Sequence, residues 1–136
     1  MLLTRCCYLQ PSNISKPGKV TDIKKRADIE RLVNHFYEKV QADPLLAPSF
    51  SHVDWVKHLP VMHSFWSSMM LGEFSYQGNP FQKHASLPIR QEHFSQWLKL
   101  FMETVDENFQ GEKADEIKER AQSIARVFQH KMGLLT

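Results

Sequence analysis

The sequence predicts an all-α fold. From Asp22 onward, apolar residues recur at intervals of three and four, which is the spacing of one face of an α-helix. No stretch shows a convincing alternation of apolar and polar residues, the pattern expected of a half-buried strand. Prolines and glycines separate the periodic stretches. We therefore expect helices joined by short connections.

The first long helix is expected to start after a capping Asp28 and to stop before Pro44. Tyr37 falls on its apolar face and is expected to be buried. Pro44 and Pro48 then enclose a compact turn that ends at Phe50, whose ring should be driven inward by the polar residues around it. The apolar face of the helix consists of Ile29, Leu32, Val33, Phe36, Tyr37 and Val40.

A second helix is predicted from about Asp54 to Leu71. Pro60 disturbs its first turns, because proline lacks an N–H donor and clashes with the carbonyl four residues earlier. Either the helix proper begins near Pro60 or its first turn is kinked. In both cases His58 sits on a deformable entry turn. The expected inner face carries Trp55, His58 or Leu59, Met62, Phe65 or Trp66, and Met69.

Two further helices are predicted in the C-terminal part of the chain. One spans Arg90 to Asn108 and the other Ala114 to Met132, with a break at Gly111 and a cap at Gly133. Their inward-facing residues are expected to be Phe94, Trp97, Leu98, Phe101 and Val105 in the first, and Ile117, Ala121, Ile124 and Phe128 in the second.

Between the second and third helices lies a short segment that carries His84. Asn79 suits a helix cap, Pro80 suits a first helical turn, and Pro88 ends the element within about two turns. Its apolar neighbours leave one imidazole in an apolar setting. A single histidine of this kind suits a haem iron better than zinc, which needs several N or S ligands. The alternative is an ordinary packed or exposed histidine.

Length and charge restrict the class of protein. At 136 residues the chain is expected to hold one domain, residues 22–136, preceded by a flexible tail at residues 1–21. A net charge of +2, with mixed signs along the helices, argues against nucleic-acid and membrane-surface binding.

Cellular location and assembly are suggested by weaker signals. The two cysteines are adjacent in sequence and are unsuited to an ordinary structural disulfide with each other, which fits a reducing cytoplasm. No signal peptide and no apolar run of membrane-spanning length is recognised. We expect a cytoplasmic monomer.

Taken together, five motifs in order along the chain resemble the truncated, two-over-two haemoglobins, and among them group III. The resemblance covers about Asp28 to Met132, and the Gly-Gly pairs typical of the first two groups are absent. It implies a truncated globin fold, a two-over-two helical sandwich around haem. The motifs are F-Y-E-K-V around Tyr37, H-L-P-V-M-H-S-F-W from His58 to Trp66, the L-G-E turn, K-H-A-S-L-P-I around His84, and H-F-S-Q-W-L-K-L-F around Trp97.

By this resemblance the cofactor is haem b, iron protoporphyrin IX, and His84 is the protein ligand of the iron. Tyr37, His58 and Trp97 match the polar positions on the side where a diatomic ligand binds. His58 is alternatively a gate to the pocket or a sixth iron ligand. The residues expected to line the cofactor are His84, Phe50, His58, Met62, Trp66, Tyr37, Trp97 and Phe36.

Three potential hydrogen-bond donors suit a pocket that holds its ligand better than one that releases it quickly. The leading hypothesis is an O2-binding haem protein that handles O2 or reactive nitrogen and oxygen species. Its small ligands would be O2, NO or peroxide, with nitric oxide dioxygenase or peroxidase-like activity and an unidentified reductase as partner. The alternatives are a reversible O2 carrier, serving oxygen transport, or a sensor, and a haem-free helical interaction module.

Overall fold

The computed structural model describes residues 20–80 and 88–134. Within these ranges the protein is helical, and an isolated parallel bridge between Thr21 and Phe109 is the sole β pairing. The all-α prediction is thereby confirmed. The elements are α2 (Arg26–Ala42), the 3-10 helix η1 (Ala47–Phe50), α3 (Trp55–Leu71), α5 (Gln91–Asn108) and α6 (Glu112–Lys131).

Helix α2 begins earlier than the sequence suggested. Its first residue is Arg26, and Asp28 lies within the first turn instead of capping it. The Asp28 carboxylate reaches back and accepts hydrogen bonds from the backbone N–H groups of Lys24 and Lys25, at 2.8 and 3.1 Å. An acidic side chain at this position also interacts favourably with the helix dipole. The helix therefore gains one turn at its start.

Helix α3 accommodates Pro60 without starting late. The helix spans Trp55–Leu71, so the predicted span from about Asp54 to Leu71 is confirmed and the alternative of a start near Pro60 is wrong. The N–H groups of Lys57 and His58 bond to the Asp54 carbonyl, at 3.1 and 2.8 Å, and establish the first turn before the proline is reached. Proline is tolerated best near a helix start, where few carbonyls precede it.

Helix α6 is capped from a distant part of the chain. The Asp22 carboxylate accepts hydrogen bonds from the N–H groups of Lys113 and Ala114, at 2.9 and 2.8 Å. Gly111 adopts φ 147°, and a Cβ there would lie 2.4 Å from Asp22 Cγ, so only glycine allows this approach. At the other end, Gly133 has φ 74° and follows the helix, as predicted for a C-terminal cap.

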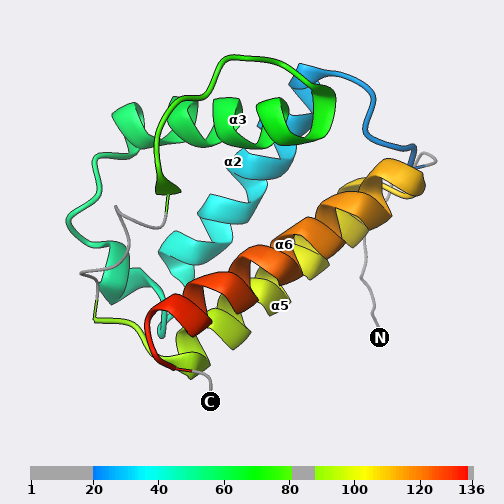
Figure 1. Cartoon of the computed structure of the whole chain (residues 1–136). Helices are drawn as coiled ribbons and strands as arrows, with labels where there is room; N and C mark the ends of the chain where they lie inside the picture. The colour runs from blue at the N-terminus through cyan, green and yellow to red at the C-terminus, as the bar shows by residue number, and fades with distance from the viewer. Residues whose placement is uncertain (1–19, 81–87, 135–136) are drawn as a thin grey trace, which may run out of the picture.

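The helices form two crossing layers. Helix α2 packs against both α3 and α5, while α5 and α6 lie side by side and antiparallel (Figure 1). This arrangement matches the predicted two-over-two sandwich. Buried side chains from all four helices meet at the centre, and the largest fully buried ones include Phe36, Phe101, Ile29, Leu32 and Ile117. In the described part of the chain, no helix is long and apolar enough to cross a membrane.

Candidate functional site

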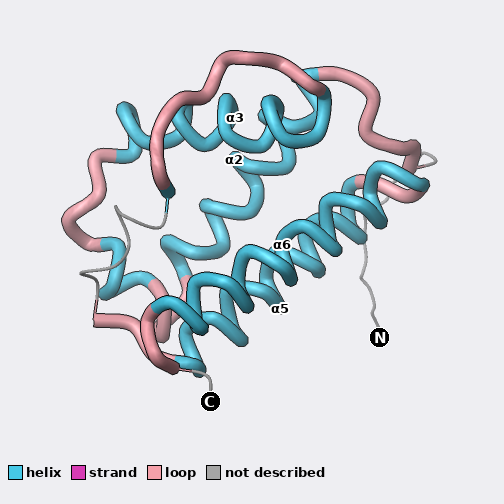
Figure 2. The backbone as a smooth tube through the Cα atoms, viewed as in Figure 1, coloured by secondary structure: helices cyan, strands magenta, loops and turns pink. Residues whose placement is uncertain are grey.

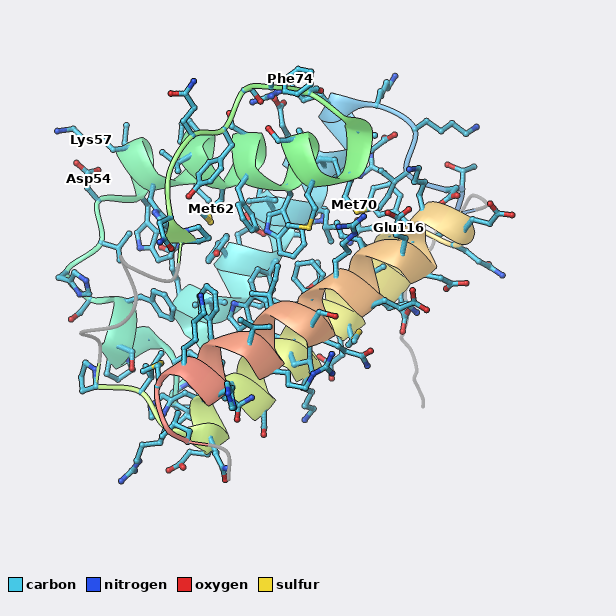
Figure 3. All side chains as sticks on the ribbon, in the orientation of Figure 1. Asp54, Lys57, Met62, Met70, Phe74 and Glu116 are labelled. Atoms are coloured by element: carbon cyan, nitrogen blue, oxygen red, sulfur yellow. The ribbon has the colours of Figure 1, made fainter. Side chains whose placement is uncertain are left out.

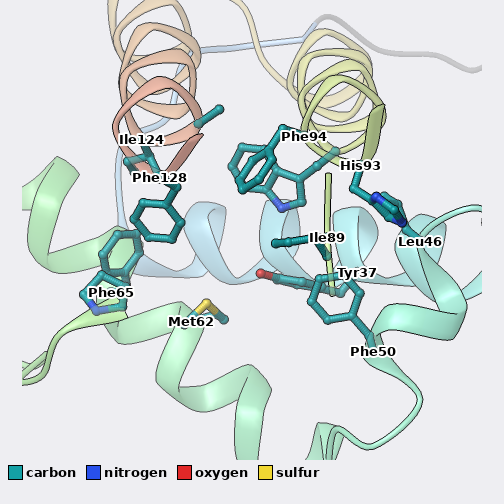
Figure 4. Close-up of a pocket in the computed structure, with 13 residues that line it drawn as sticks. Tyr37, Leu46, Phe50, Met62, Phe65, Ile89, His93, Phe94, Ile124 and Phe128 are labelled. Carbon is teal, nitrogen blue, oxygen red and sulfur yellow. The ribbon is translucent and has the colours of Figure 1, made fainter. Parts of the chain in front are cut away.

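A cavity opens beside the core, between α2, α3, the first turns of α5 and the last turns of α6. It contains about 730 Å3 of space not filled by atoms, counted out to its open mouth. The walls are apolar and rich in aromatic rings (Figure 4). They consist of Tyr37, Leu46, Phe50, Met62, Phe65, Pro80, Ile89, His93, Phe94, Trp97, Ile124, Ala125 and Phe128.

Tyr37 projects from α2 into this cavity, with its hydroxyl oxygen pointing inward (Figure 4). The side chain is only 5% exposed, and its ring lies 4.9 Å from Phe36 and 5.9 Å from His58 between centroids. Burial raises the pKa of the Tyr37 phenol far above its ordinary value. The hydroxyl therefore stays protonated and remains a hydrogen-bond donor at physiological pH.

Trp97 lines the same cavity from α5. Its indole ring is stacked on Phe101 at 5.6 Å and meets the edge of Phe36 at 5.6 Å. Among residues 20–80 and 88–134, no hydrogen bond is found for the Trp97 indole N–H or the Tyr37 hydroxyl, and neither atom is fully enclosed, because Ser67 Oγ is the sole fully buried side-chain N or O atom there without a partner. Polar groups of Tyr and Trp usually find a partner when buried. The Tyr37 hydroxyl thus points into space that a ligand can fill, and Trp97 lines the same space.

His58 borders a second, more polar hollow that adjoins the first. The two spaces share the walls formed by Phe50, Met62 and Pro80. The His58 ring also packs against Trp55, at 5.6 Å between centroids. His58 is therefore close to Tyr37 but is reached from the outer part of the cavity. The other residues around this second hollow are His52, Val53, Asp54, Lys57, Val61 and Tyr76.

Comparisons with known proteins agree with this arrangement. Residues 22–132 match the family model described as bacterial-like globin. The chain belongs to the bacterial-like globin family.

The relatives of this globin identify its group. It is 40% identical over 109 residues to the group 3 truncated haemoglobin of Campylobacter jejuni, covering 75% of this chain and 86% of the relative. It also superimposes on the crystal structure of a group III truncated haemoglobin from Campylobacter jejuni, with a TM-score of 0.77 and 37% identity. The match covers 84% of this chain and 95% of the other. The predicted fold and group are thereby confirmed, and the family implies a haem-binding protein that takes small diatomic ligands.

Two of the predicted cofactor residues lie behind the cavity of this globin. Phe36 is 1% exposed and Trp66 is 2% exposed, and neither lines either hollow. Both rings pack against Phe101, at 5.1 and 5.0 Å between centroids. They support the wall from the core side, and their direct contact with haem stays a prediction. The predicted Phe50, Met62, Tyr37 and Trp97 do line the main cavity.

The predicted iron ligand, His84, lies outside the described residues. The chain on either side of its segment does reach the site, because Pro80 and Ile89 both line the main cavity.

The sequence interpretation missed a histidine in the cavity wall, His93. Its Nδ1 accepts a hydrogen bond from the Arg90 backbone N–H at 3.0 Å, at the start of α5. In a neutral imidazole the proton then sits on Nε2. To bind iron through Nε2, His93 would have to give up this bond. Its spacing of four residues from Trp97 places both on one face of α5 and could have revealed it.

No rival metal centre is found in the parts of the chain that the structure describes, where no three potential ligand side chains come together. His35 pairs with Asn108 at 3.1 Å, and His63 pairs with Asn34 at 2.8 Å. These histidines serve as links between helices. The apolar, aromatic walls of the main cavity suit the haem that the family implies.

Proposed function

We propose that this globin holds haem b in the main cavity, with His84 as the iron ligand and with Tyr37, Trp97 and His58 around the diatomic ligand. One observation carries the proposal. The Tyr37 side chain is buried, its hydroxyl is protonated and has no hydrogen bond to another described residue, and it points into a cavity that Pro80 and Ile89, on either side of His84, both line. An unsatisfied donor in an apolar space is unfavourable unless a ligand accepts its hydrogen bond.

Haem bound here would supply an iron that takes a diatomic ligand such as O2 or NO. The chain determines how long that ligand stays. The Tyr37 hydroxyl and the Trp97 indole N–H donate hydrogen bonds toward any ligand that carries partial negative charge. Each such bond to a charged acceptor contributes about 1.5 to 3 kcal/mol, and about 1.4 kcal/mol is a tenfold change in affinity.

The outer hollow gives His58 a different role from Tyr37. His58 lines the outer hollow, which shares the walls formed by Phe50, Met62 and Pro80 with the main cavity. From this place it acts as a gate to the cavity and as a further donor, and direct ligation of iron is the competing assignment. Absorption and electron paramagnetic resonance spectra of the ferric protein and of His58→Leu distinguish them. A sixth-ligand role predicts a low-spin signal that the substitution removes, whereas a gate leaves the spin state unchanged and alters ligand entry.

A pocket with several donors suits a protein that holds O2 while it reacts. We therefore propose handling of O2 together with nitric oxide or peroxide as the working chemistry, with electrons supplied by a reductase. A transport role requires fast release, which the buried donors oppose.

The experiment that tests haem binding is a titration of the purified full-length chain with haem. Stoichiometric growth of a Soret band, followed by distinct ferric, ferrous and oxygenated spectra, is the expected result. A chain that develops no Soret band is a haem-free helical module, and the proposal fails.

A separate experiment tests the reaction. The oxygenated protein is mixed with nitric oxide under a reducing system, and consumption of nitric oxide and formation of nitrate are followed. Catalytic turnover is expected with the wild-type chain and should fall in Tyr37→Phe. Fast O2 binding and release without turnover would instead identify a carrier or a sensor.

A further inference from the structure

The loop that follows α3 forms one wall of the cavity opening. It leaves the helix at Gly72, which adopts a left-handed conformation with φ 72°, and runs back over α3 (Figure 2). We call residues 73–77 the strap. Beyond the strap, the chain reaches Pro80, which lines both hollows. The position of the strap therefore determines the position of Pro80 in the cavity wall.

Apolar burial does little to hold the strap in place. Phe74 is 98% exposed and projects away from the body of the protein (Figure 3). Among the described residues, Tyr76 makes the one aromatic contact of the strap, edge-on to Phe65 at 5.2 Å between centroids. Gly78 adopts φ 144°, and a Cβ at that position would lie 3.1 Å from the Tyr76 hydroxyl. A tight turn that requires glycine thus follows the strap. The N-terminal end of the strap has to be held by polar contacts, because Phe74 contributes no apolar burial there.

Arg26, the first residue of α2, binds the N-terminal end of the strap. Its guanidinium bonds to the Glu73 carboxylate at 2.8 Å and to the Ser75 hydroxyl at 3.3 Å. The same group donates to Ser64 of α3 at 3.1 Å and to Glu30 of α2 at 3.0 Å. The fork of a guanidinium suits several acceptors at once, whereas a lysine ammonium is a point charge. Arg26 thereby joins α2, α3 and the strap.

Ser68 continues this network toward the cavity. Its hydroxyl accepts the backbone N–H of Tyr76 at 3.1 Å and lies 3.2 Å from the Ser75 hydroxyl. The contacts run in sequence from Arg26 through Ser75 and Ser68 to Tyr76, whose side chain lines the outer hollow. The neighbouring carboxylates of Glu30 and Glu73 raise the pKa of Arg26, so the group stays charged.

We infer that Arg26 is a positioning residue for the cofactor cavity. By binding the strap to α3 it holds Tyr76 and Pro80 in the wall, and it does so without touching the cavity itself. This inference rests on the proposed haem function, because the retained occupant is the cofactor. Loss of Arg26 should loosen the wall and let the cofactor escape faster.

The first test measures haem loss from the reconstituted full-length protein to an excess of a haem-scavenging apoprotein. Arg26→Gln should lose haem about three- to tenfold faster than wild type, since several partly exposed polar contacts are removed together. Arg26→Lys keeps the charge but not the fork, and should fall between the two. Arg120→Gln is the matched control, because it removes a comparable ion pair to Glu116, at 3.2 Å, on α6. Equal rates for Arg26→Gln and Arg120→Gln would overturn the inference.

The second test separates this inference from the haem proposal. Amide hydrogen exchange is measured in the haem-free chain, where the strap amides should exchange faster in Arg26→Gln while those of α5 and α6 stay unchanged. Uniformly faster exchange would mean a general loss of stability and would contradict a positioning role. If the wild-type chain binds no haem, the proposed haem function fails. Exchange of the strap amides in the haem-free chain still shows whether Arg26 holds the strap in place. Faster strap exchange with unchanged haem loss overturns the claim that the strap retains the cofactor.

Discussion

Phe36 and Tyr37 are neighbours on α2, yet they belong to different regions of the aromatic cluster. Phe36 lies in a packed region with Trp66 and Phe101, where rings meet at 5.0 to 5.1 Å between centroids and almost nothing is exposed. Tyr37 faces an open region, the main cavity, together with Phe94. The same residue types thus stabilise the fold in one region and leave room for a ligand in the other. Substitutions should separate these two effects.

The largest effect is expected from the packed region. Phe101→Ala should lower the free energy of unfolding by about 3 to 5 kcal/mol, because the ring is fully buried and its neighbours cannot fill the space. Denaturant unfolding of the haem-free chain measures this. Phe94→Ala is the matched control, two helical turns earlier on α5 and facing the cavity. It should be clearly less destabilising. Equal losses of unfolding free energy in the two variants would contradict the distinction between the packed and the open region.

Tyr37→Phe should change the stability of the fold very little and should mainly affect the bound ligand. It removes a hydroxyl that has no partner among the described residues, so the unfolding free energy should change by less than about 1 kcal/mol. Release of O2 from the ferrous protein should accelerate about ten- to hundredfold, since a hydrogen bond to the ligand is lost. Stopped-flow dissociation measures the rate. An unchanged rate would mean that another group holds the ligand.

Trp97 belongs to both regions, because it stacks on Phe101 and lines the cavity. Trp97→Phe keeps an aromatic ring but loses the indole N–H and some volume. We expect a loss of about 1 to 2 kcal/mol in unfolding free energy together with a few-fold faster O2 release. Denaturant unfolding and stopped-flow on the same preparation report both. A change in one property alone would assign Trp97 to a single region.

The smallest effect should come from a residue outside both regions. Asp22→Ala removes the acceptor for the first N–H groups of α6 and should lower the unfolding free energy by about 1 kcal/mol, without changing O2 release. Burial opposes ionisation of this carboxyl, but the N–H groups of Lys113, Ala114 and Ile23 bonded to it lower its pKa overall.

The sign of its pH dependence follows from that lowered pKa. The stabilisation by Asp22 is present above the ordinary carboxyl pKa, about 3.9, and is lost as the pH falls through the lower pKa of the folded state. The stability difference between wild type and Asp22→Ala should therefore shrink below about pH 4. Unfolding curves recorded from pH 7 to pH 3 check this. A difference that grows on acidification would contradict the capping role.

The helical part of the fold could be predicted from the sequence because apolar spacing reports which face is buried. That pattern identified the inward positions of Tyr37, Trp97 and Phe101. It placed the start of α2 too late, since Asp28 resembles a cap but bonds backward from inside the first turn. It also left the start of α3 open, because the tolerance for Pro60 depends on the turn formed around Asp54.

The site was harder to predict, because periodicity reports burial and not whether the buried face meets a core or a cavity. Phe36 and Phe101 share the apolar pattern of Tyr37 and Phe94, yet the first two are packed and the other two line space. The role of Arg26 depends on contacts to residues 38 to 49 positions away, which no local pattern shows. His93 was expected to be solvated or to cap a helix, and it does bond to the Arg90 N–H at the start of α5, but its place in the cavity wall was not predicted.

The central claim, that His84 holds the cofactor in this cavity, is tested most directly by the absorption spectrum of ferrous His84→Gly with and without added imidazole. His93→Gln serves as the control, since His93 lines the cavity but its Nδ1 is occupied by the Arg90 N–H. We predict that His84→Gly binds haem weakly, that imidazole restores a five-coordinate ferrous spectrum, and that His93→Gln resembles wild type. A normal five-coordinate ferrous spectrum in His84→Gly without imidazole would contradict the claim.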